Sequence, residues 1–570
     1  MSSNSKDWQK LCAERKERRL QSIPKDWLIH APPESQRNVL NVPETCGLLT
    51  GHELDITSTT DVDTLLGKLA LGQWSSVEVT TAFYKRAIVA QQLTNCLTEI
   101  FVEKALARAK EVDEYFQQTG KTIGPLHGLP ISLKDQFCIK GMDTVMGYAG
   151  WIGKPAEKDS VLIEILYDLG AVPFVRTNVP QTLLWGETYN HVFGRTTNPY
   201  DRYMTPGGST GGEGALLAMH GSPLGVGTDI GGSVRIPAAF CGLYSLRPSY
   251  GRLPYQGCVN SQLGQESISS VLGPMTSSPS GVLRFTKAII DAKPWNSDPL
   301  AVRKPWSRDE YELGEHGNGV GMCFAIMWDD DIVKPHPPVI RAMEITKAAL
   351  EAAGHKVINW VPHRHAEIYK NTAQIFFADS GHDFFTDCEL SGEPLIQTMS
   401  PAENAHELVL DGLPLSRTLV EKPAHLSAYD LWQLHNEKRE LRKSYLDHWE
   451  ATKAITGTGR AVDAIISPVS PHTACPHGCH IHGFYTVLCN NLDLTTSVFP
   501  VSFADKDLDK KLPPHEFRNQ DDKAVYHLYD SELFHGLPVG LQLIGRTLEE
   551  EGVIGMTEVM DKALKAYKAA

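Results

Sequence analysis

The chain has 570 residues, and its 68 acidic side chains outnumber its 54 basic ones, giving a net charge of −14. This acidic balance argues against general binding to nucleic acids or to anionic membranes. Hydrophobic residues make up 42% of the chain, which is enough for a large core. No stretch is rich enough in Pro, Gly or Ser to act as a flexible linker, so we expect one domain over residues 1–570.

Residues 1–7 are polar and lack the apolar core of a secretory signal. No run of about 18 apolar residues predicts a membrane-spanning helix. The 11 cysteines are spread thinly along the chain. Without a secretory signal we expect free thiols in a reducing compartment, and therefore a cytoplasmic protein.

The first 120 residues have a mainly helical pattern. Ser75 and Glu78 have the spacing of a capping box, which predicts the start of an amphipathic helix. Within the single domain, residues 121–260 carry the motifs expected to form the catalytic core. Residues 261–570 are expected to form the remainder of the same sheet and its helical cover.

From about residue 128 onward, strand and helix patterns alternate. The expected helices are 160–169, 337–353 and 547–566. The expected strands are 128–135, 171–175, 322–327, 356–360, 463–466 and 539–544. Such alternation predicts a layered α/β fold.

Two glycine-rich loops, at residues 207–214 and 227–237, each present one serine, Ser209 and Ser233. Glycine allows backbone N–H groups to converge on one point, because it lacks a Cβ atom. Converging N–H groups beside a serine hydroxyl provide a nucleophile and a pocket for an oxyanion, as acyl transfer requires.

The segment 128–135 resembles an apolar strand that carries one lysine, Lys134, toward the interior. Burial removes the hydration of the charged amine and lowers its pKa, so a neutral amine can act as a base near pH 7. A lysine and two serines then form a hydrolytic set that needs no histidine. The alternative for Lys134 is a solvated position at the end of a strand.

These segments resemble the amidase signature family, and within it the fungal-type acetamidases and general amidases. Further stretches that carry the resemblance are 124–130, 178–181, 194–199, 247–254, 503–506 and 535–542. The resemblance covers most of the chain. It implies an α/β amidase signature fold, with a large twisted mixed β-sheet covered by helices on both sides. It also implies hydrolysis of amides through an acyl-enzyme, without a cofactor.

The resemblance assigns a role to each member of the set. Ser233 is the expected nucleophile, and Lys134 is the expected base. Ser209 is expected to bridge the two, with a cis peptide bond before it. The N–H groups of the four residues in the second loop would hold the oxyanion; these residues are Ile230, Gly231, Gly232 and Ser233.

Thr182 and Leu183 follow the segment 178–181, which by resemblance lines the acyl pocket. Simple packing of Leu183 is the alternative, and both remain open. If Leu183 and Trp185 point inward, they limit the length of the acyl group. We therefore expect primary amides with short or modest acyl groups.

Residues 207–211 also match the G-x-S-x-G elbow of α/β-hydrolases, which would make Ser209 the nucleophile. That motif requires a strand before the serine and an acid and a histidine after it. Residues 203–206 are a poor strand, and with 22 histidines a downstream match carries little weight.

A cluster near residue 475 offers more than enough ligands for Zn²⁺; it comprises His472, Cys475, His477, Cys479, His480 and His482. Its two cysteines are separated by three residues, and no second cysteine pair follows. We therefore expect no metal site, and expect this loop to shape the access route to the site.

Other functions share parts of this pattern. A carbamate or ester hydrolase would use the same acyl-enzyme, and an amidotransferase subunit would need partner subunits and a tRNA surface that the acidic charge does not suggest. A non-catalytic scaffold would not need all three of Lys134, Ser209 and Ser233. The expected partner is a small amide, with no nucleic acid or membrane; a monomer and a homodimer both stay open.

Overall fold

The structure, a computed structural model, describes residues 7–400 and 425–570. Within these ranges one mixed sheet contains eleven strands in the order β1-β3-β2-β6-β8-β7-β12-β13-β11-β9-β10. They are β1 (Leu97–Ile100), β2 (Pro130–Lys134), β3 (Val172–Thr177), β6 (Leu224–Asp229), β7 (Tyr244–Arg247), β8 (Val271–Thr276), β9 (Cys323–Ile326), β10 (Lys356–Asn359), β11 (Ala464–Pro468), β12 (Thr496–Phe503) and β13 (Pro538–Ile544). A separate short hairpin pairs β4 (Tyr189–Asn190) with β5 (Gly194–Arg195).

The two ends of the sheet are partly parallel, and its middle is antiparallel. Strand β2 runs parallel to both β3 and β6, and β9 runs parallel to both β10 and β11. Between these groups, each strand from β6 through β8, β7, β12 and β13 to β11 is antiparallel to its neighbour. The chain segments before and after residue 300 therefore contribute to one continuous sheet.

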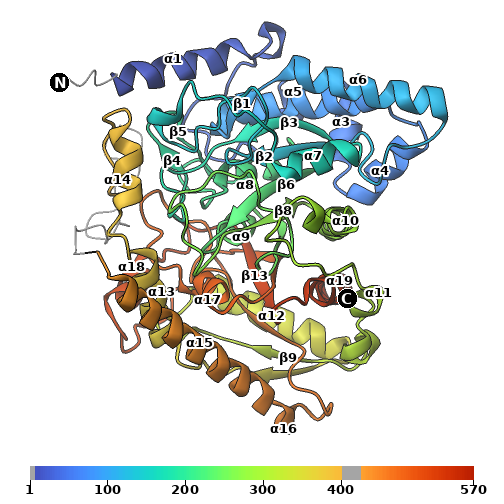
Figure 1. Cartoon of the computed structure of the whole chain (residues 1–570). Coiled ribbons are helices and arrows are strands. Elements are labelled where there is room, and N and C mark those ends of the chain that lie inside the picture. Colours follow the sequence, from blue (N-terminus) through green and yellow to red (C-terminus); the bar gives the residue numbers. More distant parts are fainter. Residues whose placement is uncertain (1–6, 401–424) are drawn as a thin grey trace.

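Helices flank this sheet (Figure 1). In the first part of the chain they are α1 (Trp8–Gln21), α2 (Val42–Thr45), α3 (Gly51–Ser58), α4 (Val62–Ala70), α5 (Ser76–Thr94), α6 (Val102–Thr119), α7 (Val161–Asp168), α8 (Gly211–Ala218), α9 (Arg235–Phe240) and α10 (Pro279–Asp291). The later ones are α11 (Arg308–Tyr311), α12 (Pro337–Ala352), α13 (His365–Phe376), α14 (His382–Glu389), α15 (Ala428–Ala451), α16 (Lys453–Thr456), α17 (Phe484–Leu492), α18 (Gln520–Leu528) and α19 (Glu550–Ala569). Four short 3₁₀ helices are η1 (Lys25–Trp27), η2 (Ala149–Trp151), η3 (Pro294–Asn296) and η4 (Gly314–Gly319).

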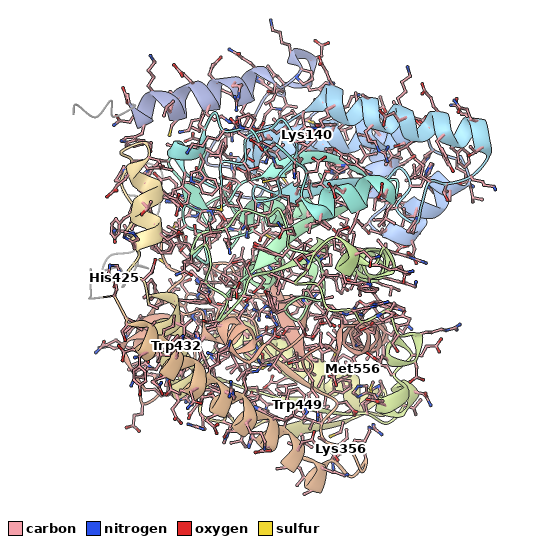
Figure 2. The ribbon with its side chains drawn as sticks, viewed as in Figure 1. Lys140, Lys356, His425, Trp432, Trp449 and Met556 are labelled. Atoms are coloured by element: carbon pink, nitrogen blue, oxygen red, sulfur yellow. The ribbon has the colours of Figure 1, made fainter. Side chains whose placement is uncertain are left out.

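Helices pack in pairs against different parts of the sheet. Helices α5 and α6 pack on each other and against β3, while α12 and α19 pack on each other and against β12 and β13 (Figure 1). On α15, Trp449 is buried, whereas Trp432 is 63% exposed on the outer side of the same helix (Figure 2). None of the helices in the described ranges has the length and hydrophobicity needed to cross a bilayer.

Helix α5 starts where its sequence predicts. The Ser75 hydroxyl accepts a hydrogen bond from the Glu78 N–H (3.1 Å), and the Glu78 carboxylate accepts one from the Ser75 N–H (2.8 Å). This capping box satisfies two N–H groups that have no partner within the helix. The helix ends at Thr94, because the next residue, Asn95, has a left-handed conformation (φ 54°) that stops further helical bonding.

The six strands and the helices expected from residue 128 onward are present, with ends shifted by a few residues. The largest shift is in the C-terminal helix, which begins at Glu550 and not at Thr547. Leu548 has a left-handed backbone (φ 64°), which a right-handed helix cannot contain. The Arg546 N–H donates to the Glu549 carboxylate across this turn (2.7 Å), so the segment forms a local turn before the helix starts.

Candidate active site

Lys134 is the last residue of β2, a strand that is buried along its whole length. Its amine lies beside the Ser209 hydroxyl (2.8 Å) and the Thr228 hydroxyl (2.8 Å), with the Thr228 carbonyl at 3.4 Å. The side chain is 0% exposed, which places the amine in the interior as the apolar strand predicts. Parallel pairing of β2 with β6 brings Thr228 to this position.

Burial lowers the pKa of Lys134 from 10.5 to about 7. Removing an ammonium group from water disfavours its charged form, and the charge of Asp229, with a smaller effect from the Glu213 carboxyl group, offsets this only in part. At neutral pH a substantial fraction of the amine is therefore uncharged and available as a base.

The first glycine loop presents Ser209 from a tightly packed backbone. The peptide bond between Gly208 and Ser209 is cis, as the family resemblance implies. A Cβ atom on Gly208 would lie 2.4 Å from the Glu187 carbonyl oxygen, so only glycine fits there. Residues 203–206 form no regular strand, and the strand-to-helix elbow of α/β-hydrolases is therefore not the geometry around Ser209.

The second glycine loop connects β6 to α9 and carries Ser233, which is 6% exposed and faces a pocket. Gly232 has φ 129°, and a Cβ atom there would lie 2.3 Å from the Thr486 hydroxyl. The Thr210 N–H donates to the Ser233 carbonyl (3.2 Å), which joins the two serine loops. The structure therefore brings Lys134, Ser209 and Ser233 into one region. Ser209 and Ser233 share no hydrogen bond between their hydroxyls in the described chain.

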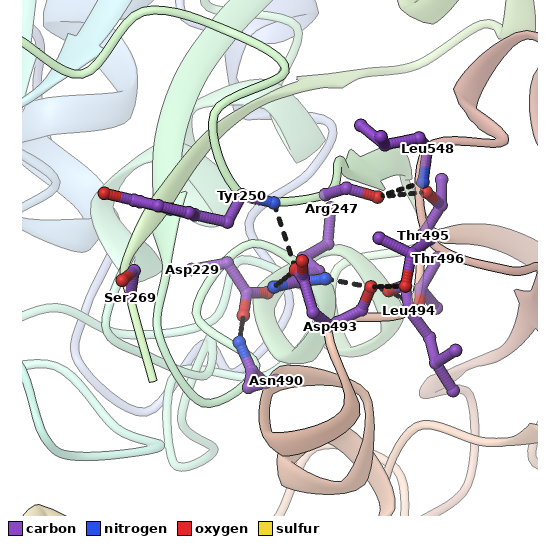
Figure 3. Close-up of polar contacts among 12 residues, drawn as sticks. Asp229, Arg247, Tyr250, Ser269, Asn490, Asp493, Leu494, Thr495, Thr496 and Leu548 are labelled. Atoms are coloured by element: carbon purple, nitrogen blue, oxygen red, sulfur yellow. Dashed lines mark hydrogen bonds and ion pairs between the residues drawn. The ribbon is translucent and has the colours of Figure 1, made fainter. Parts of the chain in front are cut away.

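A buried ion pair holds the second loop in shape. The Asp229 carboxylate accepts hydrogen bonds from Arg235 (3.0 Å) and from the Gly232 N–H (2.8 Å). It also accepts one from the Asn490 amide (2.9 Å) (Figure 3). Burial alone would raise the pKa of Asp229, but Arg235 and Asn490 together hold it well below its usual range. Asp229 is therefore ionised and acts on the backbone of the loop.

This contact corrects one expectation about the oxyanion pocket. The Gly232 N–H is used by Asp229, so it does not belong to the free donors of the loop. The N–H groups of Ile230, Gly231 and Ser233 have no acceptor within the described part of the chain. Three N–H groups in the loop that carries Ser233 are therefore not used by other groups of the described chain.

The pocket beside Ser233 has a volume of about 260 Å³ and a largely apolar wall. Its lining residues are Thr182, Leu183, Leu184, Trp185, Gly186, Gly208, Ile230, Gly231, Ser233, Ile236, Tyr369, Thr372, Ala373, Phe376, Phe377, Phe384, His480, Ile481, Gly483 and Val487. Leu183 lines this pocket and also packs in a cluster with Met146 and Tyr148.

The loop rich in cysteine and histidine reaches the pocket through His480. Three other histidines of the loop have a ring nitrogen bonded to a backbone carbonyl or a carboxylate; these are His472, His477 and His482. Across residues 7–400 and 425–570, no group of three or more His, Cys, Asp or Glu side chains is arranged to hold a metal ion.

Several residues at the site carried no signal in the sequence. Helix α13 contributes Tyr369 and Phe376 to the pocket wall, although an apolar helix pattern is equally typical of core packing. Glu213 is fully buried near Lys134, where the hydroxyls of Ser132 and Thr177 donate to its carboxyl group. Burial raises the pKa of Glu213 to about 8. In the sequence, the position of Glu213 within the glycine-rich segment 207–214 was the one indication that it lies near the site.

The family model described as Amidase matches residues 78–554. An acetamidase of Emericella nidulans is 42% identical over 559 residues, which cover 98% of this chain and 98% of the relative. An acetamidase of Aspergillus oryzae is 41% identical and covers 98% of this chain and 99% of the relative.

Two solved structures share the fold. A fatty acid amide hydrolase has a TM-score of 0.88 and 33% identity, covering 98% of this chain and 95% of that chain. A peptide amidase from Stenotrophomonas maltophilia has a TM-score of 0.65 and 21% identity, covering 89% of this chain and 97% of that chain. The second likeness shows the fold alone.

The burial of Lys134 predicts a stability gain on its removal. An unfolded lysine keeps its proton up to a pKa of 10.5, whereas folding lowers the pKa of Lys134 to about 7. Between these pH values, Lys134 must lose its proton when the chain folds. The resulting loss in the free energy of unfolding grows as the pH falls from 10.5 to 7. Lys134→Met should raise the free energy of unfolding by about 1–2 kcal/mol at neutral pH.

Urea unfolding at several pH values between 6 and about 10.5 measures this effect. The gain should shrink as the pH rises, because unfolded lysine then also loses its proton. Lys443→Met, on the exposed face of α15, is the control and should show no such trend. A gain that stays constant across the pH range would contradict the lowered pKa.

Proposed function

The chain belongs to the amidase signature family and hydrolyses amides, and we propose that it does so through Ser233, Ser209 and Lys134 with an acyl-enzyme intermediate. The observation that carries this proposal is the contact of the buried Lys134 amine with the Ser209 hydroxyl (2.8 Å), next to the loop that presents Ser233 to a pocket.

In the proposed reaction, the neutral Lys134 amine takes a proton from Ser209, which takes one from Ser233. The Ser233 oxygen attacks the amide carbon, and the free N–H groups of the second loop bind the oxyanion. The two hydroxyls must come into hydrogen-bond contact for this relay. Such contacts are often incomplete in a free enzyme and form when substrate binds.

Ser209 then returns a proton to the leaving nitrogen, because ammonia or an amine leaves poorly as an anion. Water enters and cleaves the acyl-enzyme through the same three side chains. They supply each proton transfer of the cycle, so we assign no cofactor. The same intermediate forms from an ester or a carbamate, and substrate preference decides among these classes.

For the substrate, we propose primary amides with short or modest acyl groups. The pocket of about 260 Å³ is small, and both Leu183 and Trp185 line it. The acetamidases of Emericella nidulans and Aspergillus oryzae, which are similar over nearly the whole chain, support this class.

Substitution of the two serines separates their roles. Ser233→Ala should lower kcat by about 10⁴- to 10⁶-fold, because no nucleophile remains. Ser209→Ala should lower kcat by about 10²- to 10⁴-fold, since only proton transfer is impaired. Ammonia release measures both, and Ser222→Ala, a buried serine away from the site, is the control. An inactive Ser209→Ala enzyme with an active Ser233→Ala enzyme would instead make Ser209 the nucleophile.

The pH dependence follows from the pKa of Lys134, about 7. Protonated Lys134 cannot accept a proton, so kcat/KM should rise with pH through this value and then level off. Lys134→Ala should abolish activity, whereas His480→Ala and His482→Ala should not. A histidine variant with a loss as large as that of Lys134→Ala would contradict the assignment of the base.

The size of the pocket predicts a limit on acyl length. In a series of primary amides, kcat/KM should fall once the acyl group exceeds the pocket, by about 1–3 kcal/mol for each methylene that does not fit. Leu183→Ala should move this limit toward longer acyl groups, while Leu446→Ala, exposed on α15, should leave it unchanged. A wild-type preference for long-chain amides, or for carbamates over each simple amide, would overturn the substrate class.

A further inference from the structure

Gln136 lies two residues after Lys134 and is fully buried, but it does not line the pocket. Its side-chain NH₂ group donates to the Val259 carbonyl (2.7 Å) and also lies near the Asn260 side-chain oxygen (3.3 Å). A carbonyl oxygen can only accept a hydrogen bond, so the nitrogen of the Gln136 amide must face Val259. The amide oxygen of Gln136 must consequently face the opposite way.

That oxygen faces Thr228. The Thr228 hydroxyl donates its single proton to the Gln136 side-chain oxygen. A hydroxyl has one proton to donate, so toward every other neighbour the Thr228 oxygen can only accept. The Lys134 amine, 2.8 Å away, must therefore donate to it.

The same constraint orients the amine. A neutral amine has two N–H groups and one lone pair, and Lys134 has the Thr228 hydroxyl, the Thr228 carbonyl and the Ser209 hydroxyl as neighbours. The two oxygen atoms of Thr228 both act as acceptors and use the two N–H groups. The lone pair is left facing Ser209, the direction in which a base must take a proton from that hydroxyl.

We infer that Gln136 is a positioning residue, which aims the lone pair of Lys134 at Ser209 by fixing the direction of the Thr228 hydroxyl. The inference rests on the proposed function, because it presumes that Lys134 is the base. Without Gln136, the Thr228 hydroxyl could rotate and donate to the Lys134 lone pair. The amine would then be blocked as a base although it stays buried and uncharged.

Gln136→Met tests this inference, because methionine keeps the length of the side chain and lacks both amide groups. We expect kcat to fall about 10- to 100-fold, in the lower range for the loss of one positioned proton-transfer group. KM should stay unchanged, since Gln136 lines no part of the pocket. Gln92→Met is the control: the Gln92 amide on α5 accepts from the Ile29 N–H and donates to the Trp27 and Ile88 carbonyls, and it has no contact with Lys134 or Thr228.

A double-mutant cycle with Thr228 distinguishes orientation from general structural support. Thr228→Ser retains the hydroxyl and should keep most of the activity, whereas Thr228→Val should lower kcat. Because Gln136 acts through that hydroxyl, Gln136→Met should cause no further loss when added to Thr228→Val. Gln136→Leu repeats the cycle if the methionine variant does not fold, with circular dichroism as the measure of folding.

Three outcomes would overturn the inference: kcat of Gln136→Met equal to wild type, a loss that appears in KM, or losses in the cycle that simply add. Lys134→Ala, assayed in parallel, distinguishes failure of the Gln136 role from failure of the proposed relay. If Lys134→Ala is inactive and Gln136→Met is fully active, the role of Gln136 fails alone. If Lys134→Ala remains active, the proposed relay itself fails.

Discussion

The site depends on one physical constraint, the burial of a lysine amine whose contacts in the described chain are the oxygens of Ser209 and Thr228 and not a carboxylate. An isolated charge in such a place is costly, so the group titrates near neutral pH and does not stay charged. The sheet creates this environment, because β2 has paired strands on both sides and is buried throughout. An amine that is partly uncharged at neutral pH is thus a consequence of where the fold places an ordinary side chain.

The serine loops are held by interactions that are equally buried. Asp229 binds both the backbone of its own loop and Arg235, and Arg235 reaches the Thr486 carbonyl at the start of α17 (2.9 Å). The loop is thereby tied to a segment more than 200 residues later in the chain. The same carboxylate accepts from the Gly232 N–H, so this N–H group supports the loop and is not among those without an acceptor in the described chain.

Local patterns in the sequence predicted what depends on local physics. The capping box at Ser75, the buried strand before Lys134 and the two glycine loops all follow from spacing and residue type. The sequence could not show that Leu548 would adopt a left-handed backbone, or that Asp229 would use the Gly232 N–H. Nor could it assign α13 to the pocket wall, since that contact depends on packing between segments about 180 residues apart.

The charges around Lys134 balance without a positive charge on the lysine itself. Asp229 is ionised, and its charge is cancelled by Arg235, which is buried beside it. Burial raises the pKa of Glu213 to about 8, so this carboxyl group is mostly protonated at pH 7 and adds little negative charge. A proton on Lys134 would therefore be compensated only in part. The neutral amine is the state that this environment favours. It donates to the Thr228 hydroxyl, which itself donates to Gln136, and these hydrogen bonds leave the lone pair of the amine facing Ser209.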